Sequence, residues 1–212
     1  MKQLDIPSWG YHGGLFFIDF EKFGIEQQWN WINVMRNPLE RQLSFVYYTH
    51  SDHLKKNLTF QQLNLFKCYK EGWKCCVNIP NNYQSCSFAG NIPACHNFDL
   101  ELDRKSLMEL EQTAKFNIEK YYSVVGMTEH LRDFFKVAEF YMPRFFNGSV
   151  ELYDNMQKNG FKNVNHSLQN KKSFLDPKVE RLLYSHSFLQ IDMEVYNFVQ
   201  ERFHKQYNKL FY

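Results

Sequence analysis

The stretch "WINVMRNPLERQLSFVYY", Trp31 to Tyr48, joins two patterns that predict different secondary structures. Residues Trp29–Met35 are mostly apolar and alternate at their start, which predicts a half-buried strand. Asn37 is a favoured helix N-cap residue, and Pro38 follows at the first helical position, where the N–H that proline lacks would have no partner anyway. The sequence therefore predicts a strand followed directly by a helix that reaches about Tyr48.

The junction carries the pattern R-x-P-x-x-R-x-x-S, formed by Arg36, Arg41 and Ser44, which suits an anion. Helix N-termini attract anions, a guanidinium can hold a phosphate with two hydrogen bonds, and a hydroxyl can donate another. In open α/β sheets, ligands bind at the carboxyl ends of strands. The alternative is a solvated basic face in which Arg41 pairs with a nearby carboxylate such as Glu40 or Asp52. The chemistry of these residues alone favours neither the anion site nor the solvated basic face.

Outward from this junction, apolar runs alternate with helical patterns. Leu15–Phe20 and residues 121–127 predict two further strands. Capping signals and periodicity predict helices from Ser106 to about Tyr121, from Thr128 to Pro143, and from Asp176-Pro177 nearly to Tyr212. Residues 50–100 and 155–173 are polar and loop-like. The alternation predicts an α/β fold, a sheet with flanking helices, and the length predicts a single domain over residues 1–212.

The composition excludes some partners. The net charge of +2 is too small for a nucleic-acid-binding surface, and the 18% aromatic content indicates a phenylalanine-rich core. No apolar run approaches the roughly 18–20 residues that span a bilayer, and no signal-peptide pattern follows Met1. We therefore expect a globular domain that makes no contact of its own with a membrane or with nucleic acid.

The cysteines and glycosylation motifs favour an oxidising lumen. Sequons begin at Asn57, Asn147 and Asn165, which are the candidate glycosylation sites. Five cysteines crowd one segment: Cys68, Cys75, Cys76, Cys86 and Cys95. They lack the paired spacing of zinc ligands, and the His50-x-x-His53 pair has no evident third ligand, so no metal is predicted. Two short disulfides in an irregular segment of about residues 66–96 fit better, with one thiol left over and the pairing open.

Three stretches resemble one enzyme family when taken in order. They are "YHGGLFFIDFEKFG" from Tyr11, "NVMRNPLERQLSFVYY" from Asn33, and "AKFNIEKYYSVVGMTEHLRDFFKVAEFYMPRFFNGSVELY" from Ala114. They resemble the Golgi uronyl 2-O-sulfotransferases, which act on heparan or on dermatan/chondroitin sulfate, and the resemblance extends roughly from Tyr11 to Lys209. It implies a P-loop-like sulfotransferase fold with a parallel sheet.

The resemblance also implies a reaction and a location. Family members transfer a sulfuryl group from 3'-phosphoadenosine 5'-phosphosulfate (PAPS) to the 2-hydroxyl of a uronic acid in a glycosaminoglycan. They work in the Golgi lumen as type II membrane proteins, and no metal takes part. Heparan-type members form trimers through a C-terminal tail, so the resemblance allows a homo-oligomer.

Site residues follow from the matched motifs. His12 corresponds to the family's general base, which suits a neutral imidazole because the attacking hydroxyl must lose its proton. Arg36 and Ser44 correspond to residues that hold the nucleotide's 3'-phosphate, and Tyr153 to a nucleotide-contacting tyrosine. A loop over the adenosine would run from Asn155 to Lys172, with Ser167 and Lys171 as its expected contacts.

The chain also departs from the family pattern. Gly14 replaces a second histidine, and the eleven residues before His12 contain no phosphosulfate-binding loop. The basic acceptor-binding insertion is reduced to Lys55 and Lys56, as in the divergent pipe-type members. These departures predict an N-terminally truncated chain without an anchor, or a catalytically inactive relative that binds an anionic glycan or a protein partner.

The family's disulfides match in part. Cys68 with Cys76 (or Cys75) fits the first pair. Cys95 fits one member of the second, whose expected partner position holds Ala89. Cys86 lies nearby and is the expected substitute.

Overall fold

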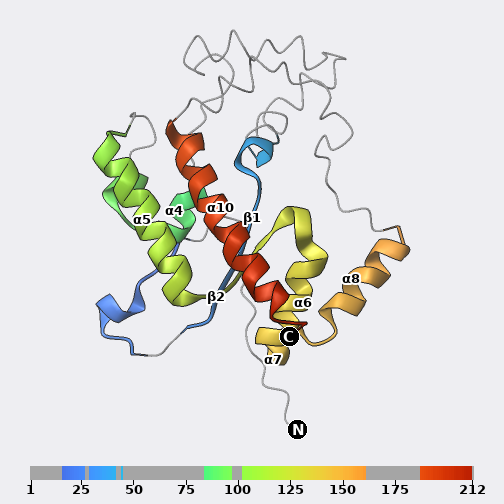
Figure 1. Ribbon diagram of the computed structural model, residues 1–212. Coiled ribbons are helices and arrows are strands. Elements are labelled where there is room, and N and C mark those ends of the chain that lie inside the picture. Colours follow the sequence, from blue (N-terminus) through green and yellow to red (C-terminus); the bar gives the residue numbers. More distant parts are fainter. Residues whose placement is uncertain are drawn as a thin grey trace, which may run out of the picture.

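The computed structural model describes residues 16–26, 29–41, 44, 84–96, 102–160 and 187–211 (Figure 1). Residues 38–41 and 44 are helical. The other elements are η1 (Phe20–Phe23), β1 (Trp31–Met35), α4 (Gln84–Ala89), η3 (Pro93–Cys95), α5 (Arg104–Tyr121), β2 (Tyr122–Met127), η4 (Thr128–His130), α6 (Leu131–Tyr141), α7 (Pro143–Phe146), α8 (Ser149–Lys158) and α10 (Ser187–Asn208).

The two strands form a parallel pair. Trp31 of β1 lies beside Tyr122 of β2, and the register continues to Met35 beside Met127. Parallel strands need a long connection, and here α4 and α5 lie between them in the sequence. Among the described residues, the predicted mixture of helices with a parallel sheet is therefore confirmed.

The core is built around β2. The consecutive residues Val124 and Val125 are 0% and 1% exposed, and consecutive strand side chains point to opposite faces. Both faces of the strand are therefore covered, as parallel strands require. Figure 1 shows α5 and α10 side by side and α6 beyond β2. These helices contribute fully buried side chains, each worth about 1.5–3 kcal/mol of burial: Leu110, Ile118, Val137, Val195 and Val199.

The predicted strand Leu15–Phe20 is wrong for the residues that the structure describes. Residues 16–19 are irregular, and Phe20 opens the turn η1. The Phe17 amide donates to the Ser87 carbonyl (2.8 Å) instead of joining the sheet. Its ring is buried, with its centroid 4.9 Å from that of Tyr121. The apolar run reflects one buried ring rather than a strand.

Part of the segment predicted to be irregular is helical. Within residues 66–96, α4 and η3 are regular turns, and Gln84 and Ser85 are buried although both are polar. A carboxylate of α10, that of Asp192, accepts the first amides of α4, as detailed below. The helix therefore depends on a residue far along the chain, which local pattern cannot reveal.

Several predicted boundaries shift. The helix expected at Ser106 begins at Arg104, because Asp103 is its N-cap and accepts the Ser106 amide (2.7 Å). Thr128 opens the short turn η4 rather than capping α6. The helix end before Pro143 is confirmed, since α6 stops at Tyr141. The loop expected from residue 155 begins later, because α8 continues to Lys158.

The structure pairs Cys86 with Cys95 in a disulfide whose Cα atoms lie 5.6 Å apart. The substitute pairing expected for Cys95 is thereby confirmed, and it ties α4 to η3. Cys68, Cys75 and Cys76 lie outside the described residues.

Replacing both Cys86 and Cys95 by serine is expected to lower the free energy of unfolding by about 2–3 kcal/mol, because the bond closes a loop of nine residues in the unfolded chain. Urea unfolding with and without dithiothreitol measures the effect. Dithiothreitol can reduce the Cys86–Cys95 bond in the parent, whereas the double variant lacks that bond. The reductant should therefore lower the free energy of unfolding of the parent by more than that of the double variant. An equal response in both proteins would contradict a stabilising Cys86–Cys95 bond.

No helix in the described part of the chain combines the length and apolar character needed to cross a membrane.

Candidate functional site

The carboxyl ends of the two parallel strands meet at one edge of the sheet. Arg36 directly follows β1, and Glu129 lies in η4, directly after β2. The helix that begins at residue 38 starts at the same edge. This is the position at which open α/β sheets bind ligands.

Asn37 caps that helix as predicted. Its Oδ1 accepts the Glu40 amide (3.2 Å), and its carbonyl accepts the Arg41 amide (2.8 Å). The Asn37 amide itself donates to Glu129 Oε1 at 2.8 Å, so the ends of the two strands are joined directly. Glu129 Oε2 also lies 3.4 Å from the Tyr196 hydroxyl, whose pKa is raised to about 12 by burial and by the nearby carboxylate.

Arg36 is held by its main chain. Its amide donates to Gln84 Oε1 (3.1 Å), and its carbonyl accepts from Gln84 Nε2 (2.8 Å). The side chain is 23% exposed, and its guanidinium lies 3.9 Å from Glu40 Oε2, at the long end of ion-pair distances. The structure therefore fixes the backbone of Arg36 and leaves its guanidinium near the surface.

Glu40 and Ser44 are four residues apart on the helix and so share one of its faces, and Arg36, which precedes the helix, reaches that face through its contact with Glu40. Ser44 is helical and half-buried. An anion on this face would meet the guanidinium of Arg36 and compete with Glu40 for it, and a hydroxyl lies about one turn beyond Glu40.

Arg41 belongs to a different environment. Burial lowers the pKa of its guanidinium, and the charge of Asp192 opposes that shift. The basic-face alternative named Glu40 and Asp52 as partners of Arg41. Asp192 of α10 interacts with Arg41 electrostatically, and Asp52 lies outside the described residues. Of the two arginines, Arg36 is thus the better candidate for a ligand.

Asp192 joins α10 to α4 beneath the junction. It is 3% exposed and accepts from the Gln84 amide (2.8 Å), the Ser85 amide (2.9 Å) and the Ser85 hydroxyl (2.5 Å). Burial raises the pKa of its carboxyl, although the bonds from Ser85 and Gln84 and the charge of Arg41 pull it down. Asp192 therefore positions Gln84, which in turn holds Arg36.

Tyr153 lies on a different part of the molecule. It is on α8, with its ring centroid 5.4 Å from that of Phe135 on α6. Asp154 accepts two bonds from Arg132 (2.8 and 2.7 Å), which fasten α8 to α6. Figure 1 shows α6 between β1 and α8, so the described residues do not bring Tyr153 to Arg36. Its nucleotide role stays a prediction.

The remaining predicted site residues divide into two groups. Asn147 is exposed between α7 and α8, in keeping with a glycosylation site that stays a prediction. The others lie outside the described residues: His12, Asn57, Asn165, Ser167 and Lys171. Within the described part, no cluster of three or more His, Cys, Asp or Glu side chains could hold a metal ion.

Sequence reasoning missed Gln84, Glu129 and Asp192. Gln84 is 48 residues from Arg36, and Glu129 is 92 residues from Asn37, so no local spacing connects them. The sequence predicted both that Asn37 caps a helix and where the strand β2 ends. No pattern in the sequence indicated that the Asn37 main-chain amide contacts Glu129, just after that strand.

Comparison with known proteins gives one consistent result, although no protein-family model matches the chain. It is 30% identical over 210 residues to heparan sulfate 2-O-sulfotransferase 1 of Homo sapiens, covering 94% of this chain and 56% of that protein. The Xenopus laevis protein of the same name is 29% identical over 198 residues (91% and 52%). Heparan sulfate 2-O-sulfotransferase hst-2 of Caenorhabditis elegans is 28% identical over 215 residues (94% and 60%).

The chain thus spans 52% to 60% of the length of these relatives, while nearly all of it is matched. The match includes the strand–helix junction and the elements from α5 to α8. The resemblance carried by the three motifs is confirmed: over nearly its whole length the chain is similar to heparan sulfate 2-O-sulfotransferases.

Proposed function

We propose that this chain is the nucleotide-binding part of a sulfotransferase that transfers a sulfuryl group from PAPS to the 2-hydroxyl of a uronic acid in heparan sulfate. Its relatives are named heparan sulfate 2-O-sulfotransferases, and they match about nine-tenths of the chain. A P-loop-like sheet and a place in the Golgi lumen follow from the same proposal, and the Cys86–Cys95 disulfide supports an oxidising compartment.

The observation that carries the proposal is the position of Arg36. Its guanidinium lies at the carboxyl edge of parallel strands, with its backbone fixed by Gln84 and its charge only loosely paired to Glu40. Arg36 and Ser44 would hold the 3'-phosphate, with Glu40 giving up the guanidinium on binding. Charge-assisted bonds of this kind are the strong ones in protein sites.

His12 would act as the general base. As the acceptor hydroxyl oxygen forms its bond to sulfur, the bond from sulfur to the phosphate oxygen breaks, and 3',5'-ADP leaves with that electron pair. The hydroxyl proton would pass to the imidazole of His12, a residue type that can accept a proton at neutral pH. Tyr153, Ser167 and Lys171 would complete the nucleotide contacts.

Binding of 3',5'-ADP tests the proposal. We expect the nucleotide to bind the parent, and Arg36→Ala to weaken binding by about 10- to 100-fold, because a hydrogen bond to a charged group is worth about 1.5–3 kcal/mol. Arg36→Lys keeps the charge but loses the paired geometry, so it should fall between the two. Isothermal titration calorimetry gives the dissociation constants.

The matched control is Arg144→Ala, which removes an exposed arginine on α7 and should leave the affinity unchanged. Two results would contradict the proposed nucleotide site. One is a parent that does not bind 3',5'-ADP, and the other is an Arg36→Ala variant that binds it as tightly as the parent.

A non-catalytic role in binding an anionic glycan or a protein partner is the second candidate. Gly14 favours it, because glycine cannot replace the side chain of a histidine. A labelled-sulfate transfer assay against heparan, dermatan and protein acceptors separates the two. Nucleotide binding without any transfer would favour the second candidate.

A further inference from the structure

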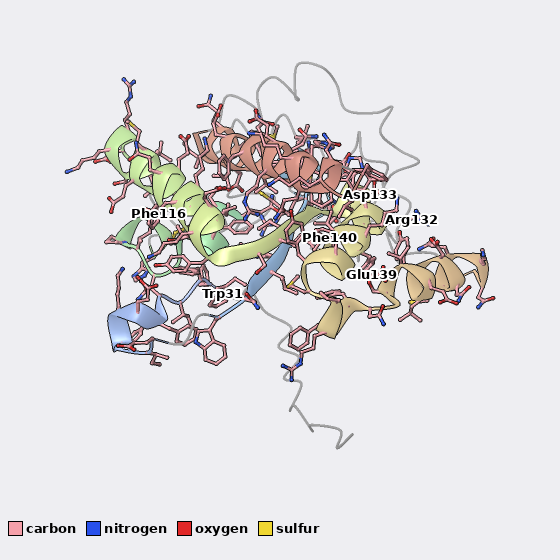
Figure 2. The ribbon with its side chains drawn as sticks, turned by 60° about the horizontal axis from the view of Figure 1, so that its bottom comes forward. Trp31, Phe116, Arg132, Asp133, Glu139 and Phe140 are labelled. Carbon is pink, nitrogen blue, oxygen red and sulfur yellow. A yellow bond between two sulfur atoms is a disulfide. The ribbon has the colours of Figure 1, made fainter. Side chains whose placement is uncertain are left out.

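An aromatic pocket lies at the end of the strand pair opposite Arg36. Its volume is about 250 Å³, and it forms where η1 meets the start of β1 and the junction of α5 with β2. Trp31, labelled in Figure 2 where the chain enters β1, is part of its wall. At about 3.3 Å per strand residue, the pocket is roughly 17 Å from Arg36.

The apolar wall is a shelf of three rings. The ring centroid of Phe20 lies 5.1 Å from that of Trp29 and 6.1 Å from that of Trp31, with interplanar angles of 33° and 23°. Trp29 is 48% exposed, so part of its indole remains accessible to a ligand. Because these rings pack on one another, the exposed part of the Trp29 indole is already held in place and does not need to be ordered on binding.

The rest of the pocket is polar and already ordered. Lys120 Nζ lies 3.1 Å from Glu21 Oε2 and 2.7 Å from the Tyr121 hydroxyl, which also donates to Glu21 (3.3 Å). The Ser123 hydroxyl donates to Asn30 Oδ1 (3.1 Å). The bonds to Tyr121 and Glu21 raise the pKa of Lys120, which keeps it charged at neutral pH.

These features narrow the class of ligand. A purely apolar molecule would displace the water that hydrogen-bonds the polar groups of the pocket. It would offer no hydrogen bonds in return, which is costly. An anion gains little, because Glu21 and Lys120 are the charged residues among the described ones that line the pocket, and their charges cancel. A pyranose ring has an apolar C–H face for the shelf and hydroxyl groups that can donate and accept at the edge.

We propose that this pocket binds an uncharged pyranose, the N-acetylglucosamine unit of an unsulfated stretch of a glycosaminoglycan, with its ring stacked on Trp29. The choice of polysaccharide rests on the proposed function, whereas the preference for a sugar rests on the pocket itself. A polysaccharide that reaches both ends of the strand pair gains a second contact, which raises the affinity for long chains over short ones.

The test uses an unsulfated octasaccharide of alternating glucuronic acid and N-acetylglucosamine, titrated into the chain by calorimetry. We expect Trp29→Ala to weaken its binding by about tenfold or more, since the variant loses the buried ring face. Trp29→Phe keeps a ring and should retain most of the affinity. Phe145→Ala, which removes a 63% exposed ring on α7, is the matched control and should have no effect.

Thermal unfolding shows whether each variant is folded, and 3',5'-ADP binding shows whether the Arg36 edge is intact. Loss of octasaccharide binding in Trp29→Ala, with nucleotide binding unchanged, supports the pocket. No binding of the octasaccharide to the parent, or equal binding by parent and Trp29→Ala, overturns it. A parent that binds the octasaccharide through Trp29 but not 3',5'-ADP overturns the proposed nucleotide site and leaves the sugar pocket standing.

Discussion

Replacing Asp192 by alanine is expected to lower the free energy of unfolding by about 3–5 kcal/mol at neutral pH. The change leaves the amides of Gln84 and Ser85 and the Ser85 hydroxyl buried without their acceptor. It also removes the negative charge that faces Arg41. Urea unfolding followed by circular dichroism gives the difference.

The control is Glu194→Ala on the same helix, whose side chain is 59% exposed and lies 4.0 Å from Lys115. Because exposed ion pairs contribute little, its effect should stay below about 1 kcal/mol. Asp192→Asn keeps one acceptor oxygen but places an NH₂ group among hydrogen-bond donors, so it should also be destabilised. Equal stabilities for the Asp192 and Glu194 variants would contradict the role given to Asp192.

The pH dependence has a definite sign. Burial raises the pKa of Asp192 in the folded protein, so the folded state binds this proton more tightly than the unfolded state does. The contribution of Asp192 to stability is therefore largest below the ordinary aspartate pKa of about 4 and decreases as the pH rises through the raised value. The stability difference between the parent and Asp192→Ala should widen as the pH falls from 7 toward 4.

The largest kinetic effect is expected for His12→Ala, which should reduce kcat for sulfate transfer by about 10²- to 10⁴-fold, the usual contribution of general base catalysis. The affinity for 3',5'-ADP should not change, because the proposed base would contact the acceptor hydroxyl rather than the nucleotide. Single-turnover transfer assays of the whole protein measure the first quantity, and calorimetry measures the second.

His204→Ala removes an exposed histidine of α10 and serves as the control with unchanged kcat. In the parent, the rate should rise with pH as the imidazole of the proposed base loses its proton, and His12→Ala should lack that rise. Full turnover in His12→Ala would assign proton removal to another group.

Features set by neighbouring residues were predicted well. Asn37 and Pro38 define the helix start by themselves, and the apolar run Tyr122–Met127 is β2 because both its faces are covered. Asp103 and Ser106 are both of residue types that favour helix N-caps and lie three positions apart, so the sequence predicted a helix but placed its start at Ser106 instead of after Asp103. Local physics therefore determines these elements to within one turn.

Features set by distant contacts were not predictable. The six-residue helix α4 has no apolar periodicity of its own, and its N-terminus is bonded to a carboxylate 108 residues away. At the candidate site, the sequence indicated Arg36 and Ser44 but not Gln84, which holds the Arg36 backbone. The candidate phosphate-binding side chains were visible in the sequence pattern, whereas the residue that fixes the Arg36 backbone was not.

The position of Gln84 links the redox state of a disulfide to the affinity for an anion, two properties that are usually measured separately. Gln84 begins the same short helix that contains Cys86, two residues before the disulfide to Cys95. The bond restrains the helix from which Gln84 holds the Arg36 backbone with two hydrogen bonds. Redox state and anion affinity should therefore change together in this protein, and the thiol content of a preparation should be known before its nucleotide affinity is compared with that of another.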